Sequence, residues 1–371
     1  MTLRRTLTAV AAAPLLALLP PTAQAAETYP DPRPITGQEI IHDPTVSRLK
    51  SGGYVAYSTG GIIGARLSED GRHWTDAGNA FAEPPAWWYE YNDKADPWAP
   101  DLSRRDGRSW LYYSVSSWGS NHSAIGVATS RTGLPGTWTD HGKVFTSETT
   151  DTWNAIDPAI IRADGRLWMS FGSYWTGIRM VELNPRTGKA VPGAEVHHLA
   201  TRPDAPYAVE GPYILKHGRH YYLFASYDAC CQGVNSTYKI KVGRSLKVTG
   251  PYVDSTGKPM LEGGGDLVLE GHGRYMGTGG ESVFRDRGKD VLAYHYYDAA
   301  DEGTPKLGLN TLSWNKKGWP SLLQGRWSVS MCGSAAWARQ ATNHLQTKPN
   351  LERQACTPPA SPSTPPSPSA K

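Results

Sequence analysis

The sequence is poor in charge, in cysteine and in phenylalanine. Only 19% of its 371 residues are charged, and it contains 4 Cys and 5 Phe against 14 Trp and 19 Tyr. A hydrophobic content of 39% is ample for a core and excludes a disordered chain. Lys and Arg form no long runs, so we expect no nucleic acid partner.

Long apolar runs are missing after the N-terminus. None approaches the roughly 20 apolar residues of a membrane span, so we expect no membrane association. The first 25 residues have a basic start (Arg4-Arg5), an apolar run (Leu7 to Leu19) and the small-residue cleavage pattern Ala23-Gln24-Ala25. We therefore expect residues 1–25 to be a signal peptide, the mature chain to begin at Ala26, and the protein to be secreted.

Secretion would permit disulfide bonds, and the four cysteines allow three pairings. We expect a Cys332–Cys356 bridge that ties down a C-terminal extension, residues 331–356. The adjacent Cys230 and Cys231 leave two alternatives open, a bridge between neighbours or two free thiols. Residues 357–371 are nearly all Pro, Ser, Thr and Ala, which predicts a linker or tail without a core.

Turn-forming residues are abundant, with 39 Gly and 29 Pro, and no helical period is sustained. Short β-branched and aromatic runs bounded by Gly predict strands. One unit recurs: an acid beside Pro or Gly, a strand, a Gly turn and an aromatic strand. The acids of its five copies are Asp43, Asp101, Asp157, Glu210 and Glu281. Two further strands complete each unit.

Five four-stranded units predict an all-β protein, a five-bladed β-propeller over residues 26–330. A β-sandwich is the alternative, but a repeat of roughly 55 residues does not fit it. The first strand of each blade lines the central channel, so matched acids would converge on one rim. Crowded carboxylates push their pKa values apart, as the acid and base of glycoside hydrolysis require. The alternative is that acids beside Pro only cap turns.

A long ordered series of motifs resembles the arabinanases of glycoside hydrolase family 43, over roughly residues 42–320. The series includes His42-Asp43-Pro44, Trp98-Ala99-Pro100-Asp101, Asn154-Ala155-Ile156-Asp157-Pro158, Phe171-Gly172-Ser173-Tyr174-Trp175, Val209-Glu210-Gly211-Pro212 and Cys230-Cys231-Gln232-Gly233. The resemblance implies the five-bladed fold and an inverting reaction. It assigns Asp43 as the general base, Glu210 as the general acid, and Asp157 as the carboxylate that orients the acid and raises its pKa. We expect Asp101 and Glu281 to be structural.

The resemblance also implies a sugar-binding surface. Trp118 matches an aromatic ring placed against the substrate, and a flat apolar face suits a furanose. Asn154, Ser173, Tyr174 and Trp175 match positions that line sugar subsites. Trp87, Trp88 and Tyr89 lie in a Pro-rich loop, which leaves two alternatives: they wall one end of the cleft, or they pack between blades.

One segment departs from the family pattern. Relatives often hold a channel ion, usually read as calcium, with a His in Gly-x-Gly-His, but here the segment is Gly277-Thr278-Gly279-Gly280. His272 and His295 are nearby candidates, although a lone His more often packs or hydrogen-bonds. We assign no metal residue and no required cofactor, and a structural calcium stays open.

Together these features predict a secreted, inverting glycoside hydrolase of α-1,5-linked L-arabinan, endo-acting and monomeric. Its partners would be plant cell-wall arabinan or arabino-oligosaccharides. An exo-acting α-L-arabinofuranosidase or exo-arabinanase is one alternative, since the catalytic acids are the same in both. A non-catalytic carbohydrate-binding propeller is another, but it would not need a matched acid, base and orienting carboxylate.

Overall fold

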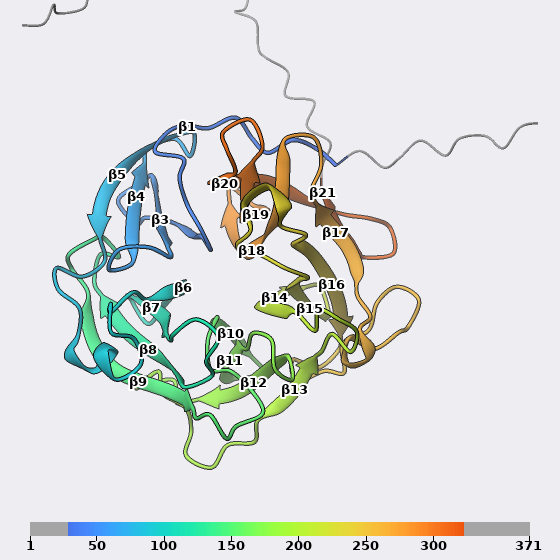
Figure 1. The fold of residues 1–371 in the computed structure, drawn as a ribbon, viewed down its shortest axis with the longest axis horizontal. Helices are drawn as coiled ribbons and strands as arrows, with labels where there is room; N and C mark the ends of the chain where they lie inside the picture. Colours follow the sequence, from blue (N-terminus) through green and yellow to red (C-terminus); the bar gives the residue numbers. More distant parts are fainter. Residues whose placement is uncertain (1–28, 323–371) are drawn as a thin grey trace, which may run out of the picture. The chain divides into compact units, whose positions relative to one another are not determined.

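The computed structural model describes residues 29–322. The signal peptide, the mature N-terminus, the Cys332–Cys356 bridge, the C-terminal extension and the tail all lie outside these residues and stay predictions. Within them, five separate sheets stand around one axis, which confirms the five-bladed β-propeller (Figure 1). No helix of the described part is long and apolar enough to cross a membrane.

Each blade is built from four strands that follow one another in the chain and pair antiparallel. Three short 3₁₀ helices lie in the connections. The elements are β1 (Thr36–Gly37), β2 (Thr45–Arg48), β3 (Tyr54–Ser58), β4 (Gly64–Ser68), β5 (His73–Asn79), η1 (Ala86–Glu90), β6 (Trp98–Arg105), β7 (Arg108–Val115), β8 (Ser123–Ser130), β9 (Thr139–Ser147), β10 (Ala159–Ala163), β11 (Arg166–Phe171), β12 (Ile178–Leu183), β13 (His197–Ala200), β14 (Val209–His217), β15 (His220–Tyr227), η2 (Gly233–Asn235), β16 (Lys239–Ser245), η3 (Met260–Glu262), β17 (Asp266–Glu270), β18 (Tyr275–Asp286), β19 (Lys289–Asp298), β20 (Thr304–Trp314) and β21 (Pro320–Leu322).

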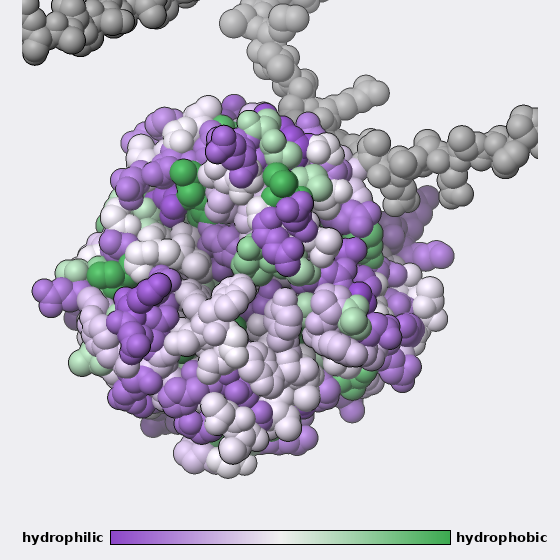
Figure 2. Space-filling view, viewed as in Figure 1, coloured by the Kyte–Doolittle hydropathy of each residue, from purple (hydrophilic) through white to green (hydrophobic). Residues whose placement is uncertain are grey.

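The core lies between blades, because each blade buries both faces against its neighbours. Strand β7 shows how the sequence does this: Leu111 and Tyr113 pack toward blade 1, while Trp110 and Tyr112 pack toward blade 3. This is the two-residue alternation of a strand, with apolar residues on both sides. Five such clusters fill the five interfaces. Because many apolar side chains are buried in these interfaces, the face in Figure 2 shows hydrophobic residues only in small scattered areas.

The same left-handed bend occurs in all five blades, near the start of the innermost strand in blades 1 to 4 and within β18 in blade 5. Its φ values are +48° at Asp43, +40° at Ala99, +56° at Asp157, +57° at Gly211 and +60° at Gly280. Pro follows the first four of these residues, and Glu281 follows the fifth. For a residue other than glycine such a backbone costs on the order of 1–2 kcal/mol, so the surrounding structure must hold it in place.

The bend corrects the prediction that the five acids occupy one matched position. Asp43 and Asp157 are at the bend itself, whereas Glu210 precedes it by one residue. Glu281 follows the bend by one residue and Asp101 by two. The repeat was recognised by its acids, but the feature that actually repeats is the backbone conformation.

Single hydrogen bonds join each innermost strand to the next, and we call this set the inter-blade belt. Every bond pairs a side chain near the bend with a backbone group of the following blade. The belt consists of Thr45 Oγ1 accepting from Leu102 N–H (3.0 Å), Asp101 Oδ2 from Ile160 N–H (3.1 Å) and Asp157 Oδ2 from Gly211 N–H (3.1 Å), with Tyr213 OH donating to Val283 C=O (2.7 Å) and Ser282 Oγ to Pro44 C=O (2.7 Å).

A strap at the N-terminus, residues 31–41, joins the last blade to the first. Arg33 N–H donates to the Leu309 carbonyl at 2.9 Å, and Leu307 N–H donates to the Glu39 carbonyl at 3.0 Å, both on β20. Between these contacts, β1 pairs in parallel with β5, the outer strand of blade 1. The strap therefore bonds to two different sheets and closes the ring from outside.

The belt makes a prediction about stability and pH. Burial raises the pKa of Asp101 to about 7, so the folded state binds its proton more tightly than the unfolded state does. The contribution of this carboxyl is fully present near pH 4 and is lost as pH rises through about 7. Asp101→Asn keeps an acceptor for Ile160 N–H but cannot ionise. We expect its urea midpoint to fall less between pH 5 and pH 8 than that of the unmodified protein.

The matched variant is Asp101→Ala, which leaves Ile160 N–H without its acceptor. Compared with Asp101→Asn, which does not ionise either, it should lower the free energy of unfolding by about 1–3 kcal/mol at every pH. Equal pH dependence in Asp101→Asn and the unmodified protein would contradict this account.

Candidate active site

A cleft of about 660 Å³ is lined by residues of blades 1 to 4. All eight residues predicted for catalysis or sugar binding lie in its wall. They are Asp43, Asp157 and Glu210, together with Trp118, Asn154, Ser173, Tyr174 and Trp175.

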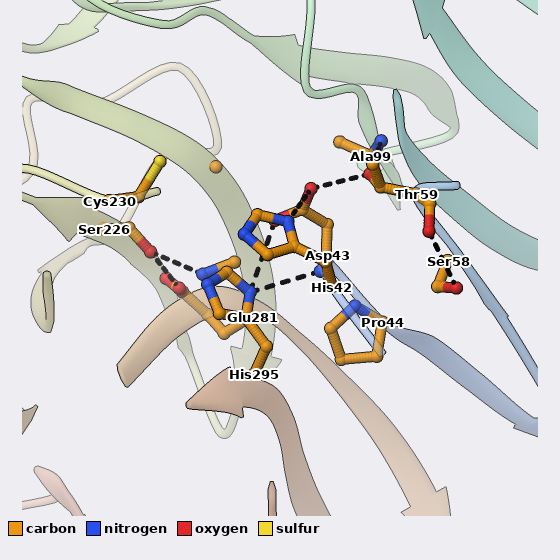
Figure 3. A network of polar contacts seen from close by, with 12 residues as sticks. His42, Asp43, Pro44, Ser58, Thr59, Ala99, Ser226, Cys230, Glu281 and His295 are labelled. Atoms are coloured by element: carbon orange, nitrogen blue, oxygen red, sulfur yellow. Dashed lines mark hydrogen bonds and ion pairs between the residues drawn. The ribbon is translucent and has the colours of Figure 1, made fainter. Parts of the chain in front are cut away.

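The two remaining acids of the repeat lie elsewhere. Asp101 and Glu281 line a narrow channel of about 40 Å³, which shares Asp43, Asp157 and Tyr238 with the cleft. Asp101 belongs to the inter-blade belt, and Glu281 Oε2 accepts a hydrogen bond from Ser226 Oγ at 2.5 Å (Figure 3). Burial raises the pKa of Glu281 to about 8. These two acids follow the left-handed bend by one or two residues, and they therefore line the channel.

Asp43 is held by groups from two other strands (Figure 3). His42 Nδ1 lies 2.8 Å from Asp43 Oδ2, Thr59 Oγ1 donates to the same oxygen at 2.7 Å, and the Asp43 N–H donates to His295 Nδ1 at 3.2 Å. Burial alone would raise the pKa of Asp43, but the charge of His42 and the hydrogen bonds of both histidines hold it well below its usual range. Asp43 is therefore a carboxylate at neutral pH, suited to accept a proton from water.

Gly280 makes the contact between Asp43 and His295 possible. A Cβ atom at this position would lie 2.8 Å from His295 Nδ1 and closer still to Asp43 Oδ1. The departure from Gly-x-Gly-His noted in the sequence thus leaves space that Asp43 and the fully buried His295 use. His272 is not in the cleft wall and lies 3.9 Å from Asp31 instead.

Glu210 stands on β14, and its pKa is shifted in the opposite direction. Burial raises its pKa, and the charge of Asp43 raises it further, although hydrogen bonds from Ser173 and Tyr238 oppose this. Ser173 Oγ donates to Glu210 Oε2 at 2.5 Å. Burial, followed by the charges of Glu210 and Asp43, also raises the pKa of Asp157. The cleft thus combines a carboxylate whose pKa is held low with a carboxyl group whose pKa is raised, which is the direction of difference that acid–base chemistry needs.

The predicted sugar-binding residues divide into two kinds. Trp118 is 80% exposed and Trp175 is 42% exposed, so both indoles can meet a ligand. Asn154 is buried, and its Oδ1 accepts from Ser123 Oγ at 2.7 Å. The hydroxyl of Ser173 is engaged by Glu210. In these contacts Asn154 supports the strand beside the Trp118 loop, and Ser173 holds the acid.

For Trp87 and Trp88 of η1 the structure favours packing over the cleft wall, whereas Tyr89 is 54% exposed and belongs to neither. Trp88 is fully buried and packs edge-on against Phe81 and Tyr113. Trp87 stacks on Tyr113, and its Nε1 donates to Asp140 at 3.0 Å. Both rings belong to the interface between blades 1 and 2, and neither lines the cleft. The Pro-rich sequence around these two rings did not indicate that they pack between the blades.

Several cleft residues were not assigned from the sequence. His42 touches Asp43, Thr59 donates to it, and Tyr238 hydrogen-bonds Glu210. His42 stood inside a recognised motif and could have been assigned from it. Cys230 and Cys231 form a disulfide and also line the cleft, which resolves the choice between a bridge and free thiols.

The groups near the channel do not form a calcium cage. Among the described residues, His42, Asp43 and His295 are the three that could share one ion. Calcium takes six to eight oxygen ligands, but this set offers one carboxylate, which already has partners. Glu281 Oε1 and His295 Nε2 are buried without a partner and supply one further oxygen and one nitrogen. The protein groups alone do not supply a calcium cage, and we derive no step through a metal.

Known proteins resemble this chain over most of its length. Residues 32–320 match the model of Glycosyl hydrolases family 43. The extracellular endo-α-(1→5)-L-arabinanase 1 of Bacillus subtilis (strain 168) is 43% identical over 290 residues, 76% of this chain and 88% of that protein. The extracellular exo-α-(1→5)-L-arabinofuranosidase ArbA of Cellvibrio japonicus (strain Ueda107) is 41% identical over 302 residues, 77% of this chain and 87% of that protein.

Solved structures agree with this. The Cellvibrio cellulosa α-L-arabinanase complexed with arabinohexaose has a TM-score of 0.74 and 40% identity, over 78% of this chain and 96% of that chain. A GH43 endo-arabinanase of Bacillus licheniformis has a TM-score of 0.73 and 42% identity, over 78% and 99%.

The contacts of Glu210 give a testable pKa change. The Ser173 hydroxyl donates to the Glu210 carboxylate and so favours its ionised form. We expect Ser173→Ala to raise the pKa of Glu210 further. Carbon-13 NMR of labelled glutamate side chains, with the Glu210 signal identified by its loss in Glu210→Gln, measures this directly. An unchanged or lower pKa in Ser173→Ala would contradict the assignment of this contact.

Proposed function

The chain belongs to glycosyl hydrolases family 43 and is a glycoside hydrolase. From this premise we propose that it is a secreted arabinanase. It would cleave α-1,5-linked L-arabinan with inversion and act within the polymer. The observation that carries the proposal is the pairing, in one cleft, of Asp43, whose pKa is held low, with Glu210, whose pKa is raised. Relatives named for α-1,5-arabinan support the substrate.

In the proposed reaction, Asp43 removes a proton from a water molecule. The water oxygen attacks the anomeric carbon from the face opposite the leaving group, and Glu210 gives its proton to the departing glycosidic oxygen. One bond forms and one breaks at the anomeric carbon, and its configuration inverts. Asp157 is a positioning residue: its Oδ2 accepts from the N–H of Gly211, next to the acid, and the two neighbouring carboxyl groups disfavour each other's ionised form.

Trp118 and Trp175 would supply flat apolar faces for the furanose rings of the bound polymer. We keep the exo-acting mode as the alternative because one relative at 41% identity is named as an exo-enzyme. The same catalytic groups serve either mode, so the products of cleavage have to distinguish them.

Leaving-group dependence separates the acid from the base. We expect Glu210→Gln to lower turnover of arabinan by about 10²–10⁴-fold. It should lower turnover of a nitrophenyl arabinofuranoside far less, because that leaving group needs little protonation. Asp43→Asn is the matched control, and it should lower turnover of both substrates by similar factors since each needs an activated water. Steady-state rates on the two substrates test this. Equal losses for both substrates in Glu210→Gln would count against its role as the acid.

Chromatography of the products of linear α-1,5-arabinan tests the mode of cleavage. We expect a ladder of oligosaccharides that shortens with time to dimers and trimers. A single short product from the earliest time point would show exo action. Binding of arabinan without any product would favour a carbohydrate-binding propeller over an enzyme.

A further inference from the structure

In three neighbouring blades, the loop between the second and third strands lines the cleft. In blade 2 this loop joins β7 to β8 and carries Trp118, and in blade 3 it joins β11 to β12 and carries Trp175. In blade 4 it joins β15 to β16 and carries the Cys230–Cys231 disulfide. The disulfide thus occupies the topological position at which the two preceding blades present an exposed indole ring.

We propose that the Cys230–Cys231 disulfide is a sugar-contacting platform, on which an arabinofuranose ring packs as it does on tryptophan. The inference rests on the proposed function, because it names a further specificity-determining element of the same cleft. Two sulfur atoms and their neighbouring methylene groups form a compact, polarisable surface without a charged or strongly hydrogen-bonding group. Such a surface suits the C–H face of a furanose and accepts no hydrogen bond strong enough to compete with the sugar hydroxyls.

The loop that carries the disulfide is fixed by its own backbone. Thr237 N–H donates to the Ala229 carbonyl at 2.9 Å, and Ala229 N–H donates to Thr237 Oγ1 at 3.2 Å. Inside this closure, Gln232 N–H donates to Ser236 Oγ at 3.0 Å. The bridge itself removes the rotamer freedom of two side chains. A surface ordered before binding loses little conformational entropy when a sugar docks.

The platform is placed against the general base. Cys231 Sγ lies 3.9 Å from His42 Nε2. The Cys231 N–H donates to the Tyr297 hydroxyl at 2.9 Å, and that hydroxyl lies 2.8 Å from His42 Nε2. Since His42 in turn contacts Asp43, a ring on the disulfide sits beside the carboxylate that activates water. The disulfide would therefore contact the sugar next to the bond that breaks.

Binding measurements in an inactive background test the platform. Titration calorimetry of Glu210→Gln protein with arabinohexaose gives the reference Kd. Adding Cys230→Ser and Cys231→Ser should raise the Kd about tenfold, and adding Trp118→Ala should have an effect of similar size. The matched control is Val234→Ala, in the same loop and 40% exposed but outside the cleft wall, which should leave the Kd within twofold.

Reduction tests the same surface without changing the loop sequence. A phosphine added to Glu210→Gln protein that also carries Cys332→Ser and Cys356→Ser can reduce only the Cys230–Cys231 bridge, and it should raise the Kd to the same extent. If the Cys230→Ser, Cys231→Ser protein does not fold, the reduction experiment alone tests whether the disulfide contacts the sugar.

An unchanged Kd after loss of the bridge, with Trp118→Ala still weakening binding, would overturn the platform. In the catalytically active protein, a change on loss of the bridge that is confined to kcat and its pH profile, and that is matched by Tyr297→Phe with the bridge intact, would overturn it as well, because the loop would then act through His42 alone. Both results leave the proposed function standing. Failure of the unmodified enzyme to release products from α-1,5-arabinan would instead overturn the proposed function.

Discussion

The inter-blade belt is the interaction on which the rest of the molecule depends. Five innermost strands meet around one axis, where there is no space for a further strand to pair with their backbone groups. A buried N–H or C=O left without a partner would cost about 1–3 kcal/mol. The belt supplies partners with side chains as small as Thr45 and Ser282, and its bonds run between adjacent blades. The left-handed bend in each blade sets where those side chains stand.

The bend also explains why carboxyl groups can be both structural and reactive within a few residues. At Asp157 one side chain serves the belt and borders the cleft. At Asp43 the bend places the carboxylate between His42 and His295, and these neighbours stabilise its charge in a buried site. At Glu210 burial outweighs the hydrogen bonds from Ser173 and Tyr238, so its pKa is raised instead. The difference between base and acid therefore lies in what surrounds each carboxyl group.

Much of this arrangement could be predicted from the sequence. The five repeats indicated five blades, and the ordered motifs brought Asp43, Asp157 and Glu210 together, because strand order and blade order coincide. The prediction that all five acids occupy one matched position was wrong. Asp101 and Glu281 are shifted by one or two residues from the bend, and they line the channel instead of the cleft. Composition could not show that Trp88 is buried and that Trp87 is partly buried against the same cluster. Contacts between distant strands, such as His42 with Tyr297, have no local signal at all.

The strap has a consequence for the order in which the molecule can be completed during synthesis. Asp31 and Asn310, which are hydrogen-bonded to each other, are separated by 279 residues in the chain. Bringing such distant segments together is entropically costly until most other contacts exist. Each blade can form as soon as its own four strands have been made, yet the first blade keeps one open flank until the fifth has emerged. The earliest part of the domain to be translated is thus among the last to be sealed.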